Sequence, residues 1–414
     1  MSNRREFMAK IVSGAATVAV SGFSNSSKVL GANDRVRIGL IGAGGRGKEI
    51  LKAAVGCPNT EAVAVADLYT RRLEEAKQIV PEAKTYSDFR RLLDDKSIDA
   101  VLIATPHHQH ALNFVPAIQA GKDVYQEKTM AFNPDHARRM RRAFEGSGRV
   151  VQVGVQSTSG PAVEHVSEHL NLESMGTITA LHTLMFRNSP CGGWMREIPP
   201  DCDLQHVDWN AFQGEVAPHP FDPKRFINWR FFWDTSGGNV FENMVHQVGF
   251  WFKLLNLQIP SKVTMVGVNL LSPAMELPDT MDVCMEHSEK ILFTWNSMFG
   301  NRYYGETYDL LLGNKGTIIR DENEIVHYEV QGKEGAGSVM EPMTRSQAPP
   351  DIIGVGDPLT FAHMQNFFDC LRSRKQPNCP FEIGYRSAIA CQMATASCRL
   401  GRTVRWDAER EEIL

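Results

Sequence analysis

The chain has 414 residues, 43% of them hydrophobic and 22% charged, which is the composition of a globular protein with a substantial core. This length favours two domains. The net charge of −4, with no basic block beyond the N-terminus, argues against a nucleic acid as partner. The eight cysteines form no C-x-x-C pair, and we expect no essential disulfide.

The first residues resemble an export signal. The paired arginines Arg4 and Arg5 precede a weakly apolar run from Ile11 to Phe23 and a polar SNSSK segment. This order is typical of a twin-arginine signal peptide over residues 1–33, which predicts a periplasmic or otherwise exported protein. The apolar run is too short for a stable membrane anchor. The alternative is a disordered basic start before a short helix, which leaves the protein in the cytoplasm.

A glycine-rich turn follows the first strand-like run. The sequence GAGGRG lies between the apolar run VRIGLI and a helix-like stretch at 48–55. In this context glycines permit a tight turn, close approach of a pyrophosphate and packing of helix on strand, while the helix N-terminus favours phosphates. The turn predicts a dinucleotide site whose expected contacts are Gly42, Gly44, Gly45, Arg46 and Gly47.

The identity of the dinucleotide depends on a second apolar run, EAVAVAD, which ends at Asp67 about 20 residues after the turn. A carboxylate at this place binds the ribose hydroxyls of NAD and repels the 2′-phosphate of NADP. We therefore predict NAD as the cofactor. Arg71 and Arg72 follow closely and can pair with a 2′-phosphate, so NADP stays the less favoured alternative.

Short apolar runs alternate with helical stretches between residues 34 and 156, with helices expected at 70–80, 110–120 and 133–145. This alternation predicts a doubly wound parallel sheet, a Rossmann-type domain with its ligand at the carboxyl ends of the strands. Gln156, at the end of the last run, is an expected cofactor contact.

Residues 157–414 lack this alternation and form the second predicted domain. Apolar runs such as KVTMVGVNLL and YDLLLGNKGTIIR predict an α/β domain with a large, mostly antiparallel open sheet. Residues 358–372 and 383–400 read as two helices. Residues 215–233 read as an irregular loop. The tryptophans in and near that loop can stack on sugar rings, although aromatic residues more often form core: Trp194, Trp229 and Trp233.

Two strand ends of the first domain carry polar side chains. The sequence TPHHQH provides expected cofactor or substrate contacts at Thr105, Pro106, His108 and His110. We predict no metal there, because the clustered histidines have no acidic or cysteine partner nearby. The sequence YQEKTM places Glu127 and Lys128, both expected cofactor contacts, at the next strand end, where the lysine can also bind a sugar hydroxyl and assist its deprotonation. The alternative is a surface lysine paired with the adjacent glutamate.

A third polar pair lies within an apolar stretch, NVFENMVHQVGFW. Glu242 and His246 are four residues apart, so on a helix they project from one face. A carboxylate and an imidazole on a buried helix are costly unless paired or functional. The histidine can act as general base and the glutamate can orient it. A structural pair is the alternative.

Taken in order, these motifs resemble the Gfo/Idh/MocA family, named for glucose–fructose oxidoreductase, inositol dehydrogenase and a rhizopine catabolism protein. The resemblance implies that Lys128, in an EKP-like motif, binds substrate and takes part in catalysis. It also maps Glu242 and His246 onto a D-x-G-x-H motif whose histidine accepts the proton. Two departures affect this mapping: Thr129 replaces the EKP proline, and glutamate and Met244 replace the aspartate and glycine.

The resemblance implies an NAD-dependent oxidoreductase acting on a hydroxyl of a sugar or glycoside. Export favours a tightly bound cofactor that is recycled in place, because free NAD is not expected outside the cytoplasm. A redox-neutral glycoside hydrolase using transient ring-hydroxyl oxidation is the alternative, and a non-catalytic sugar-binding protein is a third hypothesis. The resemblance also implies a homo-oligomer formed through the open face of the second sheet.

Overall fold

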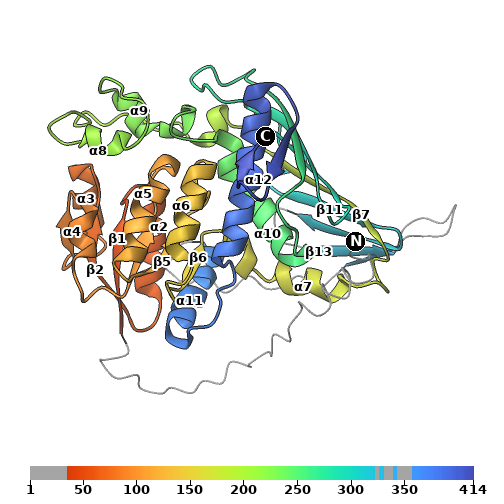
Figure 1. The fold of residues 1–414 in the computed structure, drawn as a ribbon, viewed down its shortest axis with the longest axis horizontal. Coiled ribbons are helices and arrows are strands. Elements are labelled where there is room, and N and C mark those ends of the chain that lie inside the picture. Colours follow the sequence, from red (N-terminus) through yellow and green to blue (C-terminus); the bar gives the residue numbers. More distant parts are fainter. Residues whose placement is uncertain (1–34, 322–325, 331–338, 343–356) are drawn as a thin grey trace.

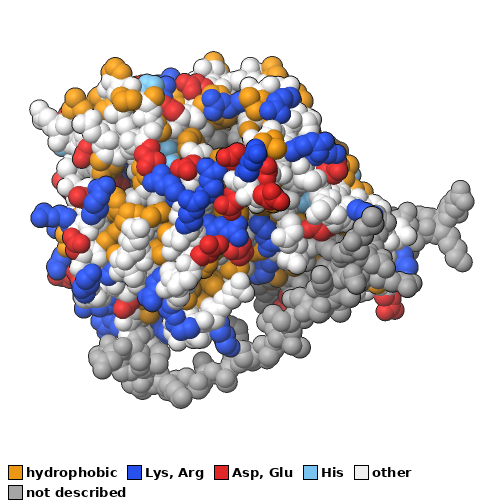
Figure 2. Space-filling view, viewed as in Figure 1, with side chains coloured by type: hydrophobic (Ala, Val, Ile, Leu, Met, Phe, Trp, Pro, Cys, Tyr) orange, Lys and Arg blue, Asp and Glu red, His pale blue; other side chains and the backbone are white. Residues whose placement is uncertain are grey.

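The computed structural model describes residues 35–321, 326–330, 339–342 and 357–414. The predicted signal peptide at 1–33 lies outside these residues. The described chain forms two sheets side by side, each with helices packed on it (Figure 1). No helix within the described ranges is long and apolar enough to cross a membrane. Acidic and basic side chains are interspersed on the face shown in Figure 2.

The first sheet is parallel and has the strand order β3-β2-β1-β4-β5-β6. Its strands are β1 (Val36–Ile41), β2 (Thr60–Ala66), β3 (Lys84–Tyr86), β4 (Ala100–Ile103), β5 (Asp123–Gln126) and β6 (Val151–Val153). Its helices are α2 (Gly45–Gly56), α3 (Thr70–Lys77), α4 (Phe89–Leu93), α5 (His110–Gln119) and α6 (Pro134–Phe144). The order reverses between β1 and β4, which opens a crevice at the carboxyl ends of these strands. The doubly wound prediction is confirmed.

The second sheet is mixed and has the order β14-β13-β12-β11-β7-β10-β9-β8-β15-β16. Its strands are β7 (Ile178–Phe186), β8 (Lys262–Val268), β9 (Thr280–Glu286), β10 (Leu292–Met298), β11 (Tyr308–Gly313), β12 (Gly316–Asp321), β13 (Val326–Val330), β14 (Val339–Pro342), β15 (Val404–Asp407) and β16 (Glu412–Ile413). Neighbouring strands pair antiparallel except β7 with β10. The mostly antiparallel sheet is thus confirmed.

One face of the second sheet is buried and the other is open. Burial alternates along β9 and β10, so that Val283 and Trp295 are buried while Cys284 is exposed. The helices on the buried side are α7 (Ala162–His169), α10 (Val245–Leu255) and α12 (Phe381–Leu400). Both predicted C-terminal helices exist, since α11 (Pro358–Ser373) precedes α12.

Helix α11 packs on the first domain although it belongs to the second half of the sequence. Its Phe367 and Phe368 share a buried apolar cluster with Leu40 of β1 and with Ile50 of α2. Figure 1 shows α11 beside α2, away from the open part of the second sheet. Helix α11 therefore completes the packing of the nucleotide domain from a position about 200 residues later than its other elements.

Residues 187–239, here called the roof segment, connect β7 to the helix before α10 and cover the carboxyl ends of the first sheet. They contain α8 (Trp209–Gln213) and α9 (Pro223–Ile227), which lie above α3 and α5 in Figure 1. Part of the predicted loop at 215–233 is therefore helical. The roof segment is joined to the first domain by two backbone hydrogen bonds, from Thr70 to His206 and from Asp208 to Leu68.

Candidate active site

A cavity of about 840 Å³ lies between the first sheet and the roof segment. At one end its wall contains Gly44 of the glycine turn and Asp67 at the end of β2. At the other end it contains Lys128, Trp229 and Glu242. The polar strand ends predicted from the sequence therefore open into the same space as the glycine turn.

The glycines at the nucleotide end meet distinct steric demands. Gly42 has φ of +92°, and a Cβ there would lie 2.8 Å from the backbone of Ala104. A Cβ on Gly47 would overlap the carbonyl oxygen of Gly42, so this glycine lets α2 pack against the turn. Gly44 and Gly45 have open space where a Cβ would stand, and both line the cavity. No side chain caps α2, so its first N–H groups are available to a pyrophosphate.

Asp67 is fixed by the glycine turn. Its carboxylate accepts hydrogen bonds from the backbone N–H of Ala43 at 2.6 Å and of Tyr69 at 3.0 Å. Burial raises the pKa of Asp67, while Arg72 and these N–H groups oppose the rise. The carboxylate lines the cavity, where it can accept hydrogen bonds from ribose hydroxyls. The nucleotide end therefore fits NAD.

Arg46 links the glycine turn to the lysine-bearing strand end. Its Nε donates to Glu127 Oε1 at 2.8 Å, its Nη1 donates to Thr360 of α11 at 3.2 Å, and its Nη2 donates to Gln156. Burial alone would lower the pKa of Arg46, but Glu127 outweighs burial and raises it. Of this group, Arg46 and Glu127 line the cavity, so Gln156 acts through them.

The three clustered histidines point to different partners. His110 bridges the carbonyl oxygens of Thr129 and Thr105, at 2.7 and 2.8 Å. His108 bonds the carbonyl oxygen of Phe212 in the roof segment at 2.7 Å, and burial lowers its pKa to about 4. His107 alone turns towards the cavity. Within the described ranges no His, Cys, Asp or Glu residues form a metal-binding group of three or more.

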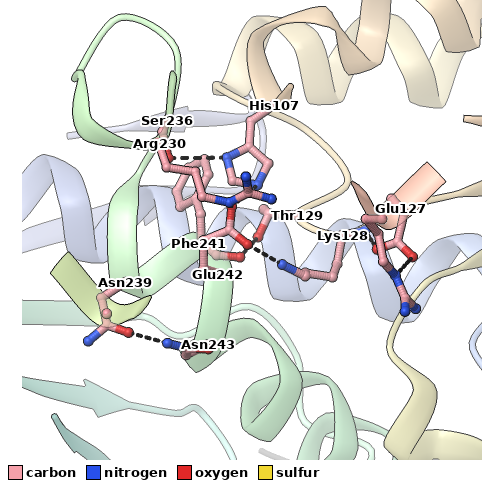
Figure 3. Close-up of polar contacts among 12 residues, drawn as sticks. His107, Glu127, Lys128, Thr129, Arg230, Ser236, Asn239, Phe241, Glu242 and Asn243 are labelled. Atoms are coloured by element: carbon pink, nitrogen blue, oxygen red, sulfur yellow. Dashed lines mark hydrogen bonds and ion pairs between the residues drawn. The ribbon is translucent and has the colours of Figure 1, made fainter. Parts of the chain in front are cut away.

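At the other end of the cavity, Glu242 holds two cations (Figure 3). Its Oε2 lies 2.5 Å from Lys128 Nζ, and its Oε1 lies 2.8 Å from Arg230 Nε and 3.5 Å from His107 Nε2. Burial would raise the pKa of Glu242, but Arg230 and Lys128 outweigh burial and hold it well below its usual value. Glu242 is therefore ionised, and its charge is balanced by two cations from separate parts of the chain, Lys128 and Arg230.

Glu242 occupies an irregular turn rather than the α-helix expected from the sequence. Residues Val240–Met244 form a π-helical turn, a feature common at functional sites, and α10 begins at Val245. Thr129, which stands where the family motif has proline, donates from its hydroxyl to the carbonyl oxygen of Phe241 at 2.7 Å. This bond joins the strand end that carries Lys128 to the turn that carries Glu242.

His246 lies on the first turn of α10 and is largely but not fully buried. Burial of its ring, together with the nearby charges of Lys128 and Arg46, lowers its pKa well below the usual value. It makes no hydrogen bond within the described part of the chain and lies outside the wall of the cavity. Lys128 and Arg230 bind the two carboxylate oxygens of Glu242, and no hydrogen bond joins this glutamate to His246. Orientation of His246 by Glu242 therefore stays a prediction.

Arg230 was not singled out as a site residue by the sequence, and His107 was noted only as a member of the histidine cluster. Arg230 stacks over the Trp229 ring, with its guanidinium carbon 4.3 Å from the ring centroid, and both residues line the cavity. Nothing in the local sequence of the roof segment marks this arginine. Trp194 also lines the cavity, whereas Trp233 lies outside its wall in a separate apolar cluster.

Comparisons with known proteins agree with this geometry. Residues 36–155 match the family model for the NAD-binding Rossmann fold of the Gfo/Idh/MocA oxidoreductases, and residues 211–405 match the model for their C-terminal α/β domain. An uncharacterised oxidoreductase of Streptococcus pneumoniae is 26% identical over 69% of this chain and 68% of its own length. A glycosyl hydrolase family 109 protein of Stenotrophomonas maltophilia is 36% identical over 29% of this chain and 28% of its own.

The fold is also shared with solved structures. A levoglucosan dehydrogenase, solved in complex with NADH and levoglucosan, superposes with a TM-score of 0.68 at 18% identity, covering 90% of this chain and 99% of its own. The two matched family models together cover most of the chain, and the cavity holds the glycine turn, Asp67 and Lys128 in one site. The chain is an NAD-binding oxidoreductase of the Gfo/Idh/MocA family.

Proposed function

We propose that the protein oxidises a hydroxyl group of a sugar or glycoside, with NAD held in the same cavity. The observation that carries the proposal is the continuity of this cavity, from the glycine turn to the ion-paired Lys128. Bound NAD supplies a hydride acceptor. Trp194 and Trp229 both line the cavity, and the ring of Trp194 offers an apolar face beside charged groups, a combination suited to a sugar ring. The levoglucosan dehydrogenase with this fold supports a sugar as substrate.

In the proposed reaction, the proton of the substrate hydroxyl passes to His246, the histidine that the family resemblance assigns as proton acceptor, although in this structure it lies outside the wall of the cavity. A histidine can accept a proton only when its imidazole is neutral, and the lowered pKa of His246 keeps it neutral at pH 7. Lys128, held beside the ionised Glu242, donates a hydrogen bond to the substrate oxygen and stabilises the negative charge that develops there. Glu242 keeps the ammonium group in place, and Arg230 keeps Glu242 ionised.

The cofactor stays bound between turnovers in this proposal. The roof segment bonds to the chain on both sides of Tyr69, at the end of the cavity where Asp67 lies. Such enclosure slows exchange of the dinucleotide. A twin-arginine signal would export the folded protein with its NAD to the periplasm. There a second carbonyl compound would accept the hydride from the NADH that sugar oxidation forms, and so regenerate NAD.

A redox-neutral glycoside hydrolase is the second candidate. It is favoured by the 36% identity to a glycosyl hydrolase family 109 protein over 132 residues. In this reaction the ring hydroxyl is oxidised only transiently, the leaving group is eliminated, water adds, and the ketone is reduced again. The same His246 and Lys128 would handle the hydroxyl proton in both directions.

One experiment separates these functions. The protein is purified without added NAD, its bound dinucleotide is identified by mass spectrometry, and it is incubated with sugars and glycosides. We expect bound NAD and a keto-sugar whose amount rises when a carbonyl acceptor is supplied. Aglycone release without keto-sugar supports the hydrolase. Sugar binding without any reaction, in a protein shown to hold NAD, contradicts both and supports a binding protein.

The protein is also proposed to form a homo-oligomer through the open face of the second sheet. Val266 and Val268 of β8 are 68% and 47% exposed, and Leu292 of β10 is 43% exposed. Apolar side chains on an open sheet face favour association with a second copy. Light scattering after gel filtration measures the mass, and a monomer at micromolar concentration contradicts the proposal.

A further inference from the structure

We propose that Asp201, in the roof segment, sets the preference for NAD over NADP by neutralising Arg71. This residue lies far outside the glycine turn and the strand end that usually determine dinucleotide choice. The inference rests on dinucleotide binding alone, so it does not depend on which sugar reaction the protein catalyses.

Arg71 is the residue that a 2′-phosphate would be expected to meet. It lies in the first turn of α3, four residues after Asp67, and lines the cavity. Its Nε donates to both carboxylate oxygens of Asp201, at 2.9 Å each. Tyr69 donates from its hydroxyl to Asp201 Oδ1 at 2.6 Å. Asp201 is thus bound by two side chains of the first domain at the entrance to α3.

The backbone holds Asp201 in this position. Thr70 donates its N–H to the carbonyl oxygen of His206, and Asp208 donates its N–H to that of Leu68. These bonds lie immediately before and after Tyr69 along the first domain. Arg71 and Tyr69 hold the pKa of Asp201 below its usual value, so the carboxylate is charged at neutral pH. A fixed negative charge therefore stands beside Arg71.

Two further cations at this end of the cavity, Arg72 and Lys48, are also paired with carboxylates, whereas Arg196 of the cavity wall donates to the carbonyl oxygens of Gly193 and Met195. Arg72 lies 3.8 Å from Asp67 and stacks on Phe226, while Lys48 bonds to Glu75. A 2′-phosphate carries a charge of about −1.5 to −2. On entering this site it would meet the carboxylates of Asp67 and Asp201, and the nearest cations, Arg71 and Arg72, are already paired with them. NAD has no 2′-phosphate, so it avoids this repulsion, and its ribose hydroxyls can donate hydrogen bonds to Asp67.

Loss of the Asp201 charge leaves Arg71 unpaired and able to serve as a phosphate ligand. In the Asp201→Asn variant we expect NADP to bind more tightly relative to NAD, so that the ratio of the NADP to the NAD dissociation constant falls about tenfold. This is the change expected when only NADP gains a charge-assisted hydrogen bond, the one from Arg71. Asparagine keeps the shape of the side chain and still accepts from Tyr69. The matched control is Asp203→Asn, which removes the same charge from the same loop without touching Arg71.

The test uses the full-length protein freed of dinucleotide, with NAD and NADP titrated by calorimetry. We expect the Asp203→Asn variant to keep the wild-type ratio of the two dissociation constants. The double variant Asp201→Asn with Arg71→Gln should lose the gain in relative NADP affinity that Asp201→Asn shows alone. An equal gain in Asp203→Asn, or a gain that survives Arg71→Gln, overturns the proposal. The single variant Arg71→Gln gives an independent test. Because Asp201 already neutralises Arg71 in the wild type, we expect this variant to bind NADP about as weakly as the wild type does. A large loss of NADP affinity in that variant overturns the proposal even if Asp201→Asn fails to fold.

Discussion

The two ends of the cavity are built on different principles. The nucleotide end is shaped by backbone, because Gly42 and Gly47 permit a turn that a Cβ would obstruct and Gly44 leaves open space. The opposite end is assembled from charged side chains, with Glu242 between Lys128 and Arg230. The first end comes mainly from one continuous stretch of chain, while the second draws on residues more than 100 positions apart.

This difference determines how each end can fail. A backbone-shaped site is lost when an added atom fills the space of the ligand or of the turn. A charge-assembled site is lost when one member of the ion-paired group is removed, because its partners are then buried without compensation. Substitutions at the two ends should therefore separate the chemical step from dinucleotide binding.

The largest effect is expected for Lys128→Met. The change removes the ammonium group that binds the substrate oxygen and leaves Glu242 paired with Arg230. We expect kcat/KM for the sugar to fall about 10³-fold, within the range for lost acid–base assistance, while NAD affinity changes little. Steady-state kinetics and calorimetry measure the two quantities.

Lys48→Met is the matched control. Lys48 lines the same cavity and also pairs with a carboxylate, that of Glu75, but it lies at the nucleotide end. When NAD is saturating, we expect this variant to keep the wild-type kcat. Equal losses of kcat in both lysine variants would show that the ends do not act separately.

A smaller effect, about 100-fold in NAD affinity, is expected for either of two glycine substitutions. Gly44→Ala places a methyl group in the cavity, where no protein atom beyond residue 44 and its two chain neighbours lies within 4 Å of it. The backbone φ of −64° at Gly44 also suits alanine, so the substitution causes no backbone strain. Its folding stability should stay unchanged. Gly47→Ala forces the turn and α2 apart, and should also lower the free energy of unfolding by about 1–3 kcal/mol. Titration with NAD and thermal unfolding of the apoprotein distinguish the two. A stable Gly44→Ala protein with wild-type affinity contradicts the assignment of the open space to the pyrophosphate.

The sequence predicts the backbone-shaped end well. Periodicity, the glycine spacing and the position of Asp67 are local features, and each of them led to the correct element in the correct sheet. The place of α11 was not predictable in this way. Its apolar face fits any core, and only tertiary packing directs Phe367 to α2 rather than to the second sheet.

The charged end was only partly predictable, because its members gain meaning from contacts distant in sequence. Lys128 and Glu242 stand out because polar residues interrupt apolar runs. Arg230 gives no such signal within an aromatic, arginine-containing segment, although it is the strongest influence that lowers the pKa of Glu242. The histidine cluster misleads in the opposite direction, since His108 and His110 bond mainly to backbone carbonyls and lie outside the cavity wall.

The smallest effect, about tenfold in kcat/KM, is expected for Arg230→Gln. The substitution removes the cation that chiefly holds the pKa of Glu242 low, while Lys128 keeps the carboxylate partly stabilised. The pKa of Glu242 should therefore rise towards its usual value. Protonation of Glu242 releases Lys128 and so abolishes activity. As the pH falls, the variant should therefore lose activity at a higher pH than the wild type does.

The pH profile distinguishes this electrostatic role from a structural one. Arg225→Gln removes a positive charge from the same roof segment, where Arg225 pairs with Asp234 instead of Glu242. That variant should keep the acid limb of the wild type. If Arg230→Gln lowers kcat/KM without moving the acid limb, Arg230 acts by packing on Trp229 and not through Glu242. A shift confined to Arg230→Gln means that the ionisation of one buried carboxylate depends on an arginine contributed by the roof of the site.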